Sequence, residues 1–494
     1  MSQPGTRRPE RDAVILLRQF AEQAFSRAAG APLVAGNSVR ILRNAAENYP
    51  AWLDAIHAAQ HRIYFENYII ADDAVGREFA AALAARARAG VRVRVIYDWM
   101  GALGAASRQV LQPVVDAGGE VRCFNSPRLG SPFGWLSRDH RKMVAVDGEA
   151  GFVTGLCVSR KWTGNPALGM EPWRDTGVEV RGPAIADIER AFAEVWAATG
   201  APIPEDELAD PGTIPPAGEV MLRVLATQPN VAALYRLDQL IAAMARRTLW
   251  LTDAYFVGIA PYVQALRAAA LDGVDVRLLV PGASDVPIIS PLSRSGYRPL
   301  LEAGIRVFEW NGPMLHSKTS VADCRWARVG SSNLNIASWM GNYELDVAVD
   351  NEQFAGMMQG IYEEDLAHAT EIVLSARNRV QAAAIRRRPR GRRGGSASRA
   401  AAGALRISNT VGAAMTNRRV LGPAEAGMMT GVGLVLLGLA VAAAVWPYAV
   451  ALPLAVLGVW MAVSFLARAK ELRAQRSRDA EEDDGAGPSG PRRF

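Results

Sequence analysis

Two segments of this sequence repeat one spacing of histidine, lysine and aspartate. Both read His-x-Lys-x4-Asp, with His140, Lys142 and Asp147 in the first copy and His316, Lys318 and Asp323 in the second. Each copy begins a β-branched run that predicts a strand, where residues two apart point to the same side. We therefore expect an imidazole and an ammonium group to face one space, an arrangement that suits an anionic ligand.

The use of lysine and histidine along the chain supports a functional interpretation of both copies. Only four of the 55 basic residues are lysines, and two of these belong to the repeated motif. Of the five histidines, His57, His61 and His368 lie in helix-like stretches where surface or packing roles suffice. A single His-x-Lys would favour an ordinary strand, whereas two matched copies favour a site. No cluster of ligand residues has metal-binding spacing, so we expect no metal.

Length and composition indicate a globular chain with a basic segment. The 494 residues suggest two to four domains, and a hydrophobic content of 50% can build sizeable cores. The three cysteines are scattered without disulfide or metal spacing, which favours a reducing compartment. Ten arginines and no acidic residue lie between Arg386 and Arg419, so the excess of positive charge is local.

A repeated order of predicted elements indicates an internal duplication. A strand, a helix and a strand are predicted at 63–70, 76–89 and 91–97, and again at 248–256, 262–271 and 274–280, followed by matching pieces at 116–125 and 302–311. We expect an α/β fold of two similar lobes, at 37–201 and 219–380, joined by a proline-rich connector at 202–218. An amphipathic helix at 12–29, within an N-terminal segment 1–36, is expected to pack on the globular part.

The last quarter of the chain predicts a membrane anchor. No charged residue lies between Glu425 and Arg468, and 428–446 and 449–467 each hold 19 residues. At about 1.5 Å per residue, each stretch reaches about 28 Å, close to the thickness of the hydrocarbon layer. We expect an arginine-rich segment at 381–425, a transmembrane hairpin at 426–467 and a charged tail at 468–494, with both ends in the cytoplasm.

The doubled motif resembles the phospholipase D superfamily, in particular the bacterial cardiolipin synthases of the cardiolipin synthase B-like branch. The resemblance runs from about Asn37 to Asp350. It extends to the segments Glu66-Asn67-Tyr68-Ile69, Trp173-Arg174-Asp175-Thr176 and Asn342-Tyr343-Glu344. It implies two α/β lobes, with mixed β-sheets flanked by helices, that each give one motif to a single site on a pseudo-twofold axis.

The resemblance also implies a role for each candidate residue. One histidine forms a phosphohistidine while the other protonates the leaving alcohol; we expect His140 to attack and His316 to act as acid, although the near-symmetry leaves the order open. By resemblance Glu344 orients one ring and Asp175 the other. Lys142, Lys318, Ser331 and Asn333 are expected to bind phosphate, and Asp147 and Asp323 serve either in catalysis or in turns.

The chain departs from the family after the first motif. Relatives usually have Gly-Gly-x-Asn there, whereas this chain has Thr154-Gly155-Leu156-Cys157. A thiol is a weaker hydrogen-bond donor than an asparagine amide, so one half of the phosphate clamp is altered. Thr154 and Ser159 are the candidates to compensate.

Three functional hypotheses follow. The first is a cardiolipin synthase that transfers a phosphatidyl group from phosphatidylglycerol, or a related phospholipid, to a lipid hydroxyl. The second is a phosphodiesterase that hydrolyses phospholipid or nucleic acid, and the third is a non-enzymatic scaffold that binds anionic lipid. The first implies a bacterial inner-membrane protein with its lobes in the cytoplasm. It also implies anionic lipids as partners, no nucleic acid and no cofactor.

Overall fold

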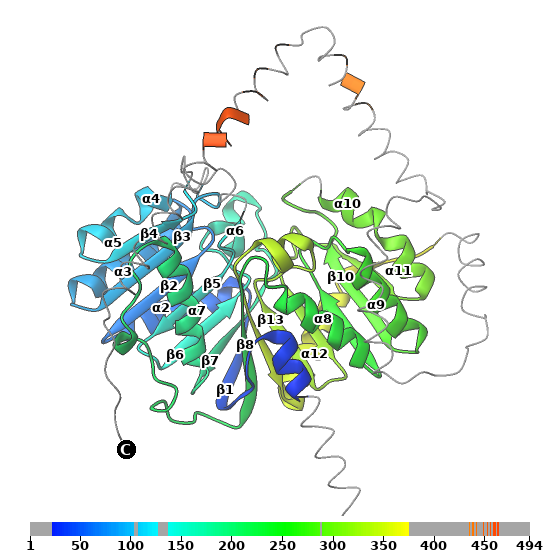
Figure 1. Ribbon diagram of the computed structural model, residues 1–494, viewed down its shortest axis with the longest axis horizontal. Helices are drawn as coiled ribbons and strands as arrows, with labels where there is room; N and C mark the ends of the chain where they lie inside the picture. The colour runs from blue at the N-terminus through cyan, green and yellow to red at the C-terminus, as the bar shows by residue number, and fades with distance from the viewer. Residues whose placement is uncertain are drawn as a thin grey trace, which may run out of the picture. The chain divides into compact units, whose positions relative to one another are not determined.

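The computed structural model describes residues 22–102, 107–126, 137–286 and 289–374, with scattered positions between 434 and 463. Strands and helices alternate through this part of the chain, which confirms the predicted mixed α/β fold (Figure 1). The first half contains β1 (Val34–Arg43), α2 (Asn44–Ala58), β2 (Arg62–Asn67), α3 (Ala74–Arg88), β3 (Arg92–Asp98), α4 (Ser107–Val110), α5 (Gln112–Asp116), β4 (Glu120–Phe124), β5 (Lys142–Val146), β6 (Ala150–Thr154), α6 (Arg160–Thr163), η2 (Pro166–Leu168), β7 (Thr176–Arg181), α7 (Ile185–Thr199) and η3 (Glu205–Glu207).

The second half repeats this order with few changes. It contains β8 (Val220–Thr227), α8 (Ala233–Met244), β9 (Thr248–Thr252), α9 (Ala260–Leu271), β10 (Asp275–Pro281), α10 (Ile289–Ser295), α11 (Tyr297–Ala303), β11 (Arg306–Trp310), β12 (Thr319–Ala322), β13 (Trp326–Gly330), the π-helical turn η4 (Ala337–Gly341), β14 (Glu344–Asp350), α12 (Glu352–Leu366) and β15 (Ala369–Ile372). The expected strands at 63–70 and 248–256 end earlier than predicted, at Asn67 and Thr252.

The strands of both halves join in one mixed sheet. Its order is β15-β11-β10-β9-β12-β13-β14-β8-β1-β7-β6-β5-β2-β3-β4, in which β8 and β1 pair antiparallel at the junction. From this junction outward, the strands of the two halves follow one another in the same order. Within the described sheet, β15 is the one strand without a counterpart in the other half. The parallel strands β2, β3 and β4 match β9, β10 and β11. The duplication therefore places corresponding strands at corresponding distances from the junction.

Local sequence explains how the βα units of the first half form. β3 is buried along nearly its whole length, as expected for a parallel strand that is covered on both faces. α3 begins at an N-cap, because the Asp73 carboxylate accepts hydrogen bonds from the backbone N–H groups of Val75 and Gly76. A side chain at Gly76 would come within 1.8 Å of the Ala71 carbonyl oxygen, so this tight turn requires glycine.

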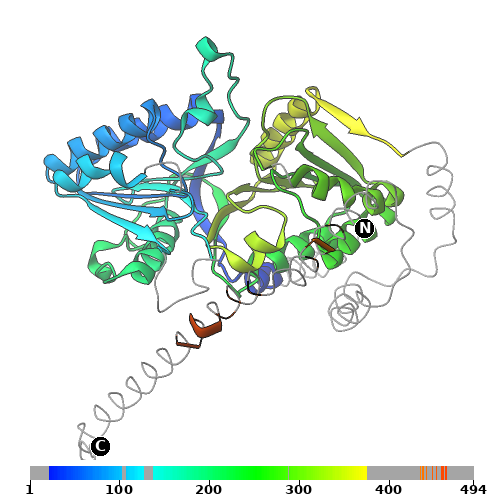
Figure 2. The same ribbon diagram turned by 90° about the horizontal axis from the view of Figure 1, so that it is seen from above.

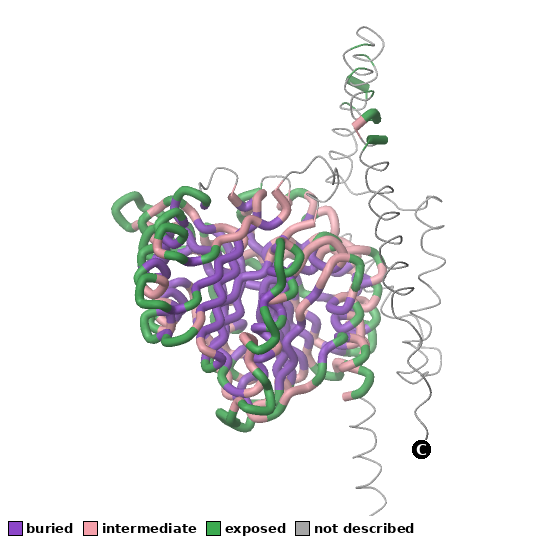
Figure 3. The backbone as a smooth tube through the Cα atoms, turned by 60° about the vertical axis from the view of Figure 1, so that its left-hand side comes forward, coloured by how far each residue is buried: buried purple, intermediate pink, exposed green. Residues whose placement is uncertain are grey.

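The hydrophobic core runs across the junction between the halves. One cluster of buried side chains combines Val153 and Val178 of the first half with Val224, Val329 and Leu345 of the second. Figure 3 shows that the buried backbone is concentrated in the strands, with exposed segments around them. Figure 2 shows the two halves side by side, each with helices on its outer side. Burial of shared apolar area therefore holds the halves together.

Part of the predicted N-terminal helix lies within the described residues. Residues 22–29 are helical, and Phe25 and Ala29 pack against the core of the second half. The buried Arg223 forms an ion pair with Glu22 at 2.5 Å and lies over the Phe25 ring. This segment packs on the globular part, as the sequence predicted.

The predicted transmembrane hairpin at 426–467 lies largely outside the described residues, as do the arginine-rich segment and the tail. A few isolated positions, among them Leu434 and Val459, are helical and exposed. Among the residues that the structure describes, no helix is both long and apolar enough to cross a membrane.

Candidate active site

Each motif histidine lies shortly before a strand, in a segment whose backbone contacts the opposite half of the chain. β5 begins at Lys142 and β12 at Thr319, so both histidines precede the strands on which the sequence placed them. The backbone N–H of His140 donates to the Tyr343 carbonyl at 2.9 Å, and that of His316 donates to the Arg174 carbonyl at 2.7 Å. Each histidine is therefore held by backbone from the other half.

A carboxylate from the opposite half also binds each imidazole. The His140 Nδ1 lies 2.9 Å from Glu344 Oε2, and the His316 Nδ1 lies 2.7 Å from Asp175 Oδ2. Both carboxylates are fully buried, and together they fix the orientation of the two rings. Since each Nδ1 is bound to a carboxylate, Nε2 is the nitrogen through which each ring would react; at His316 the Lys318 ammonium lies beside it. The structure thus places Glu344 beside His140 and Asp175 beside His316, each across the junction between the halves.

Hydrogen bonds keep both carboxylates ionised in spite of their burial. Glu344 also accepts from Ser331 Oγ and Ser338 Oγ, both at 2.6 Å, and from Asn342 Nδ2 at 3.1 Å. Burial acts to raise the pKa of Glu344, but His140 and these donors hold the pKa below its usual value.

Asp175 is held in the same way in the first half. It accepts from Trp162 Nε1 at 3.0 Å and from the Thr176 N–H at 2.9 Å. Burial acts to raise its pKa, but the charge and hydrogen bond of His316 and the nearby ammonium group of Lys318 keep the pKa low. Each ring therefore faces a charged carboxylate at Nδ1.

The two motif lysines are buried beside these rings. The Lys142 ammonium donates to the His140 carbonyl, and the Lys318 ammonium donates to the His316 carbonyl and lies 3.1 Å from His316 Nε2. Burial lowers the pKa of Lys318 to about 8, and burial together with the Lys318 charge lowers the pKa of His316 to about 4. Burial also lowers the pKa of His140.

Charges from each half act on the histidine of the other half. The Lys318 charge acts to lower the pKa of His140, and the Lys142 charge acts to lower that of His316. The two imidazoles and the two ammonium groups therefore lie in one electrostatic environment. Their N–H groups are the kind of donors that bind an anion.

Residues expected to bind phosphate fall into two groups. Asn333 is buried, and its Oδ1, which can only accept a hydrogen bond, has no donor among the described residues. The Ser331 hydroxyl instead binds Glu344, and the Thr154 hydroxyl accepts from the Leu156 N–H at 3.1 Å. Ser331 thus orients a carboxylate, and Thr154 stabilises a turn.

Cys157 occupies the position in the first half that Asn333 occupies in the second. Its side chain is buried, and the charges of Lys142 and Lys318 both act on the thiol. Burial is the larger effect and raises the pKa of Cys157, so the thiol stays protonated. The clamp therefore has an amide on one side and a weak donor on the other.

Aromatic rings that sequence reasoning did not assign to the site surround the imidazoles. The Tyr68 ring meets His140 edge-on at 5.1 Å, and Trp162 and Tyr255 meet His316 at 5.2 and 5.7 Å between ring centroids. No sequence pattern pointed to Ser338 as part of the site either. It lies in the π-helical turn η4, and its contact with Glu344 depends on this local bulge.

The motif aspartates lie elsewhere. Asp147 accepts from three consecutive N–H groups, those of Gln60, His61 and Arg62, and Asp323 accepts from those of Arg246, Arg247 and Thr248. Both have positive φ, at 56° and 54°, in the turns after β5 and β12. Seven residues of extended chain separate each from its histidine, about 23 Å at 3.3 Å per residue. The expectation that they are catalytic is thus replaced by a role in fixing turns.

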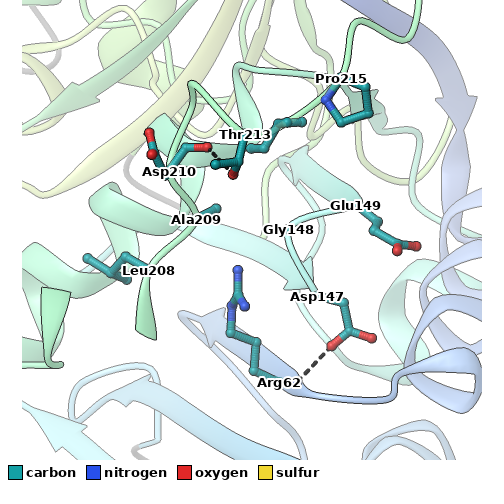
Figure 4. A pocket seen from close by; sticks show the side chains of 10 residues that line it. Arg62, Asp147, Gly148, Glu149, Leu208, Ala209, Asp210, Thr213 and Pro215 are labelled. Carbon is teal, nitrogen blue, oxygen red and sulfur yellow. Dashed lines mark hydrogen bonds between the residues drawn. The ribbon is translucent and has the colours of Figure 1, made fainter. Parts of the chain in front are cut away.

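Figure 4 shows Asp147 in its surroundings, beside a surface cavity at the far end of β5. Arg62 and Asp147 line this cavity together with residues of the connector, such as Leu208 and Asp210. The Arg62 side chain is engaged by Glu189 at 3.1 Å, and Asp147 by backbone. The two side chains that Arg62 and Asp147 offer to this cavity are therefore already engaged by other parts of the protein.

The turn role of the motif aspartates predicts a loss of stability without a loss of chemistry. Asp323→Ala leaves three N–H groups without their acceptor and should lower the free energy of unfolding by about 1–3 kcal/mol. Thermal unfolding of the full-length protein measures this change. A variant that keeps its melting temperature but loses turnover would contradict the assignment.

No group of three or more His, Cys, Asp and Glu side chains in the described part of the chain is arranged to hold a metal ion.

Comparison with known proteins identifies similar sequences. Residues 52–196 and 238–366 match the family described as "Cardiolipin synthase, PLD-like domain". A cardiolipin synthase of Alkalihalophilus pseudofirmus is 31% identical over 70% of this chain and 69% of its own length. Cardiolipin synthase A of Pseudomonas fluorescens is 34% identical over 69% and 71%, and that of Pseudomonas aeruginosa (strain PAO1) is 34% identical over 73% of each chain.

A solved structure has a similar fold. The crystal structure of phosphatidylserine synthase from Haemophilus influenzae aligns with a TM-score of 0.54, at 16% identity, over 72% of this chain and 92% of its own. At this level of identity the likeness concerns the fold alone.

Proposed function

This chain belongs to the family of phospholipase D-like cardiolipin synthases, and we propose that it transfers a phosphatidyl group from phosphatidylglycerol, or a related phospholipid, to a lipid hydroxyl. The observation that carries the proposal is the pair of imidazoles, each oriented at Nδ1 by a buried carboxylate from the other half. Two oriented rings beside two ammonium groups suit the in-line exchange of one alcohol for another at phosphorus.

In the first step, His140 Nε2 attacks phosphorus and forms a P–N bond. The P–O bond to the leaving alcohol breaks, and the alcohol oxygen takes the proton of His316 Nε2. In the second step, the acceptor hydroxyl gives its proton to His316 as its oxygen attacks, and the P–N bond breaks. No net proton is gained or lost over the two steps.

The charge of the substrate supports the required protonation states. Both rings have lowered pKa values, which favours a neutral nucleophile at His140. The leaving-group acid must carry a proton, and a bound phosphodiester anion beside Lys318 offsets the charge that depresses the His316 pKa. Substrate binding would thereby raise the pKa of the acid.

Hydrolysis is the second candidate function, in which water takes the place of the lipid hydroxyl in the second step. The similarity to cardiolipin synthases favours transfer over hydrolysis.

The membrane anchor remains part of the proposal. Its support is the uncharged run at 426–467 between the arginine-rich segment 381–425 and the charged tail 468–494. This arrangement puts lobes 37–201 and 219–380, with the connector 202–218, at the cytoplasmic face of the bacterial inner membrane.

A product assay separates the candidate functions. Full-length protein in phosphatidylglycerol vesicles with a chelator should release glycerol and form cardiolipin in equal amounts. Phosphatidic acid as the main product would instead support hydrolysis, and the absence of both products would overturn the proposal.

Each histidine should be indispensable for turnover. His140→Ala and His316→Ala should each reduce cardiolipin formation by at least about 10³-fold, because each removes a group that bonds to a reacting atom. Protein quenched in alkaline detergent after incubation with a donor radiolabelled at phosphorus should carry a labelled phosphatidyl group on His140 in the wild type, because the P–N bond of a phosphohistidine is cleaved by acid but survives alkali. An active single variant would exclude the shared-site mechanism.

The alkaline side of the pH profile should depend on Lys318. Its ammonium form binds the phosphate, and its pKa is lowered to about 8, so turnover should fall as the pH rises through this value. Lys318→Arg keeps a positive charge at all these pH values and should move the alkaline fall upward, at a lower maximal rate. Initial rates between pH 6 and 10 test this shift.

A further inference from the structure

A pair of buried carboxyl groups lies directly behind the segment that carries His140. Glu66, near the end of β2, and Asp139, the residue before His140, are both fully buried. Their side chains lie within hydrogen-bonding reach of each other. The reaction proposed above uses neither of them.

No other hydrogen-bond donor explains this pair. Among the described residues, no N–H or O–H group donates to either carboxyl oxygen of Glu66 or to the Oδ2 of Asp139. Two ionised carboxylates in contact would repel each other and leave three buried oxygens unsatisfied. A single proton between them removes the repulsion and joins one Glu66 oxygen to Asp139 Oδ2 by a hydrogen bond.

The surrounding charges agree with a shared proton. The groups that face the pair are Asp98, Arg138, Arg141, Glu194 and Tyr343. Arg141 supplies the positive charge, but the hydrogen bonds of its guanidinium group go to Glu194 and to the carbonyl oxygens of Ala191, Thr227 and Glu344. Burial raises the pKa of Asp139 to about 7 and raises the pKa of Glu66 well above its usual value.

The pair is connected to His140 through the backbone. The Asp139 N–H donates to Asp98 Oδ2 at 2.9 Å, and Asp139 Oδ1 accepts from the Arg141 N–H at 3.3 Å. The backbone of Asp139 is therefore held by Asp98, and its side chain binds the backbone of Arg141, the residue after His140. A displacement of Asp139 would move the imidazole relative to Glu344.

The second half has no such pair. In the sheet register, Thr252 takes the place of Glu66, and the residue before His316 is the apolar Leu315. The two halves thus differ at both positions. The carboxyl pair lies in the half whose histidine, His140, is the nucleophile in the proposed reaction.

We propose that Glu66 and Asp139 share one proton in the folded protein and act as positioning residues for His140. The role in positioning rests on the proposed function, whereas the shared proton does not.

Thermal stability as a function of pH tests the shared proton without any assay of turnover. A raised carboxyl pKa contributes stability that is complete at low pH and is lost as the pH rises through the folded-state value. Glu66→Gln keeps a donor to Asp139 and cannot ionise. Its melting temperature should equal or fall below that of the wild type at pH 5 and exceed it at pH 9.

A buried glutamate with ordinary partners supplies the control. Glu189 accepts from Arg62 and from the Ala209 N–H, so Glu189→Gln should lower the melting temperature at pH 9. If Glu66→Gln behaves in the same way as Glu189→Gln, Glu66 is an ordinary ionised carboxylate and the shared proton is wrong.

Kinetics test the positioning role. Glu66→Leu removes the donor and leaves Asp139 buried without a partner, so kcat should fall by about 10²-fold while KM stays unchanged, because misplacement of a reacting group costs about this much. Glu66→Gln should restore most of kcat. Equal losses in the two variants, both folded at the assay temperature, would overturn the positioning role.

A wild type without turnover would instead count against the proposed function and leave the melting comparison intact.

Discussion

The site depends on one constraint: the carboxylate that orients each imidazole comes from the opposite half of the chain. Glu344 can bind His140, and Asp175 can bind His316, only when the two halves are docked. The antiparallel pairing of β8 with β1 and the shared apolar core provide this docking. The energy that holds the halves together is therefore also the energy that orients the two imidazoles.

Duplication supplies two similar half-sites, whereas the chemistry needs two different ones. Burial lowers the pKa of both imidazoles, so the repeated geometry alone does not separate nucleophile from acid. The differences lie in the surroundings of the two imidazoles. Cys157 in the first half takes the position of Asn333 in the second, and the Glu66–Asp139 pair of the first half has no counterpart at the corresponding positions of the second. Small substitutions around a repeated frame can thus separate the roles of two identical side chains.

Sequence patterns predicted the elements and the reacting groups better than the contacts between them. The β-branched runs and the doubled spacing identified the strands and both histidines, because these signals are local. Of the two roles left open for Asp147 and Asp323, the contacts favour the turn role, since seven residues along a strand carry a side chain to its far end. The partners of Ser331 and Ser338 depend on a turn and a π-helical bulge that leave no periodic signal.

The pseudo-twofold frame has a consequence for how such a site can arise. Contacts that run reciprocally from one half to the other have the symmetry of an isologous dimer interface. A chain of half this length, with a single His-x-Lys motif, could build the same arrangement by pairing with a second copy of itself. Fusion of the two copies would then free each to diverge, so that the present protein resembles a heterodimer within one polypeptide.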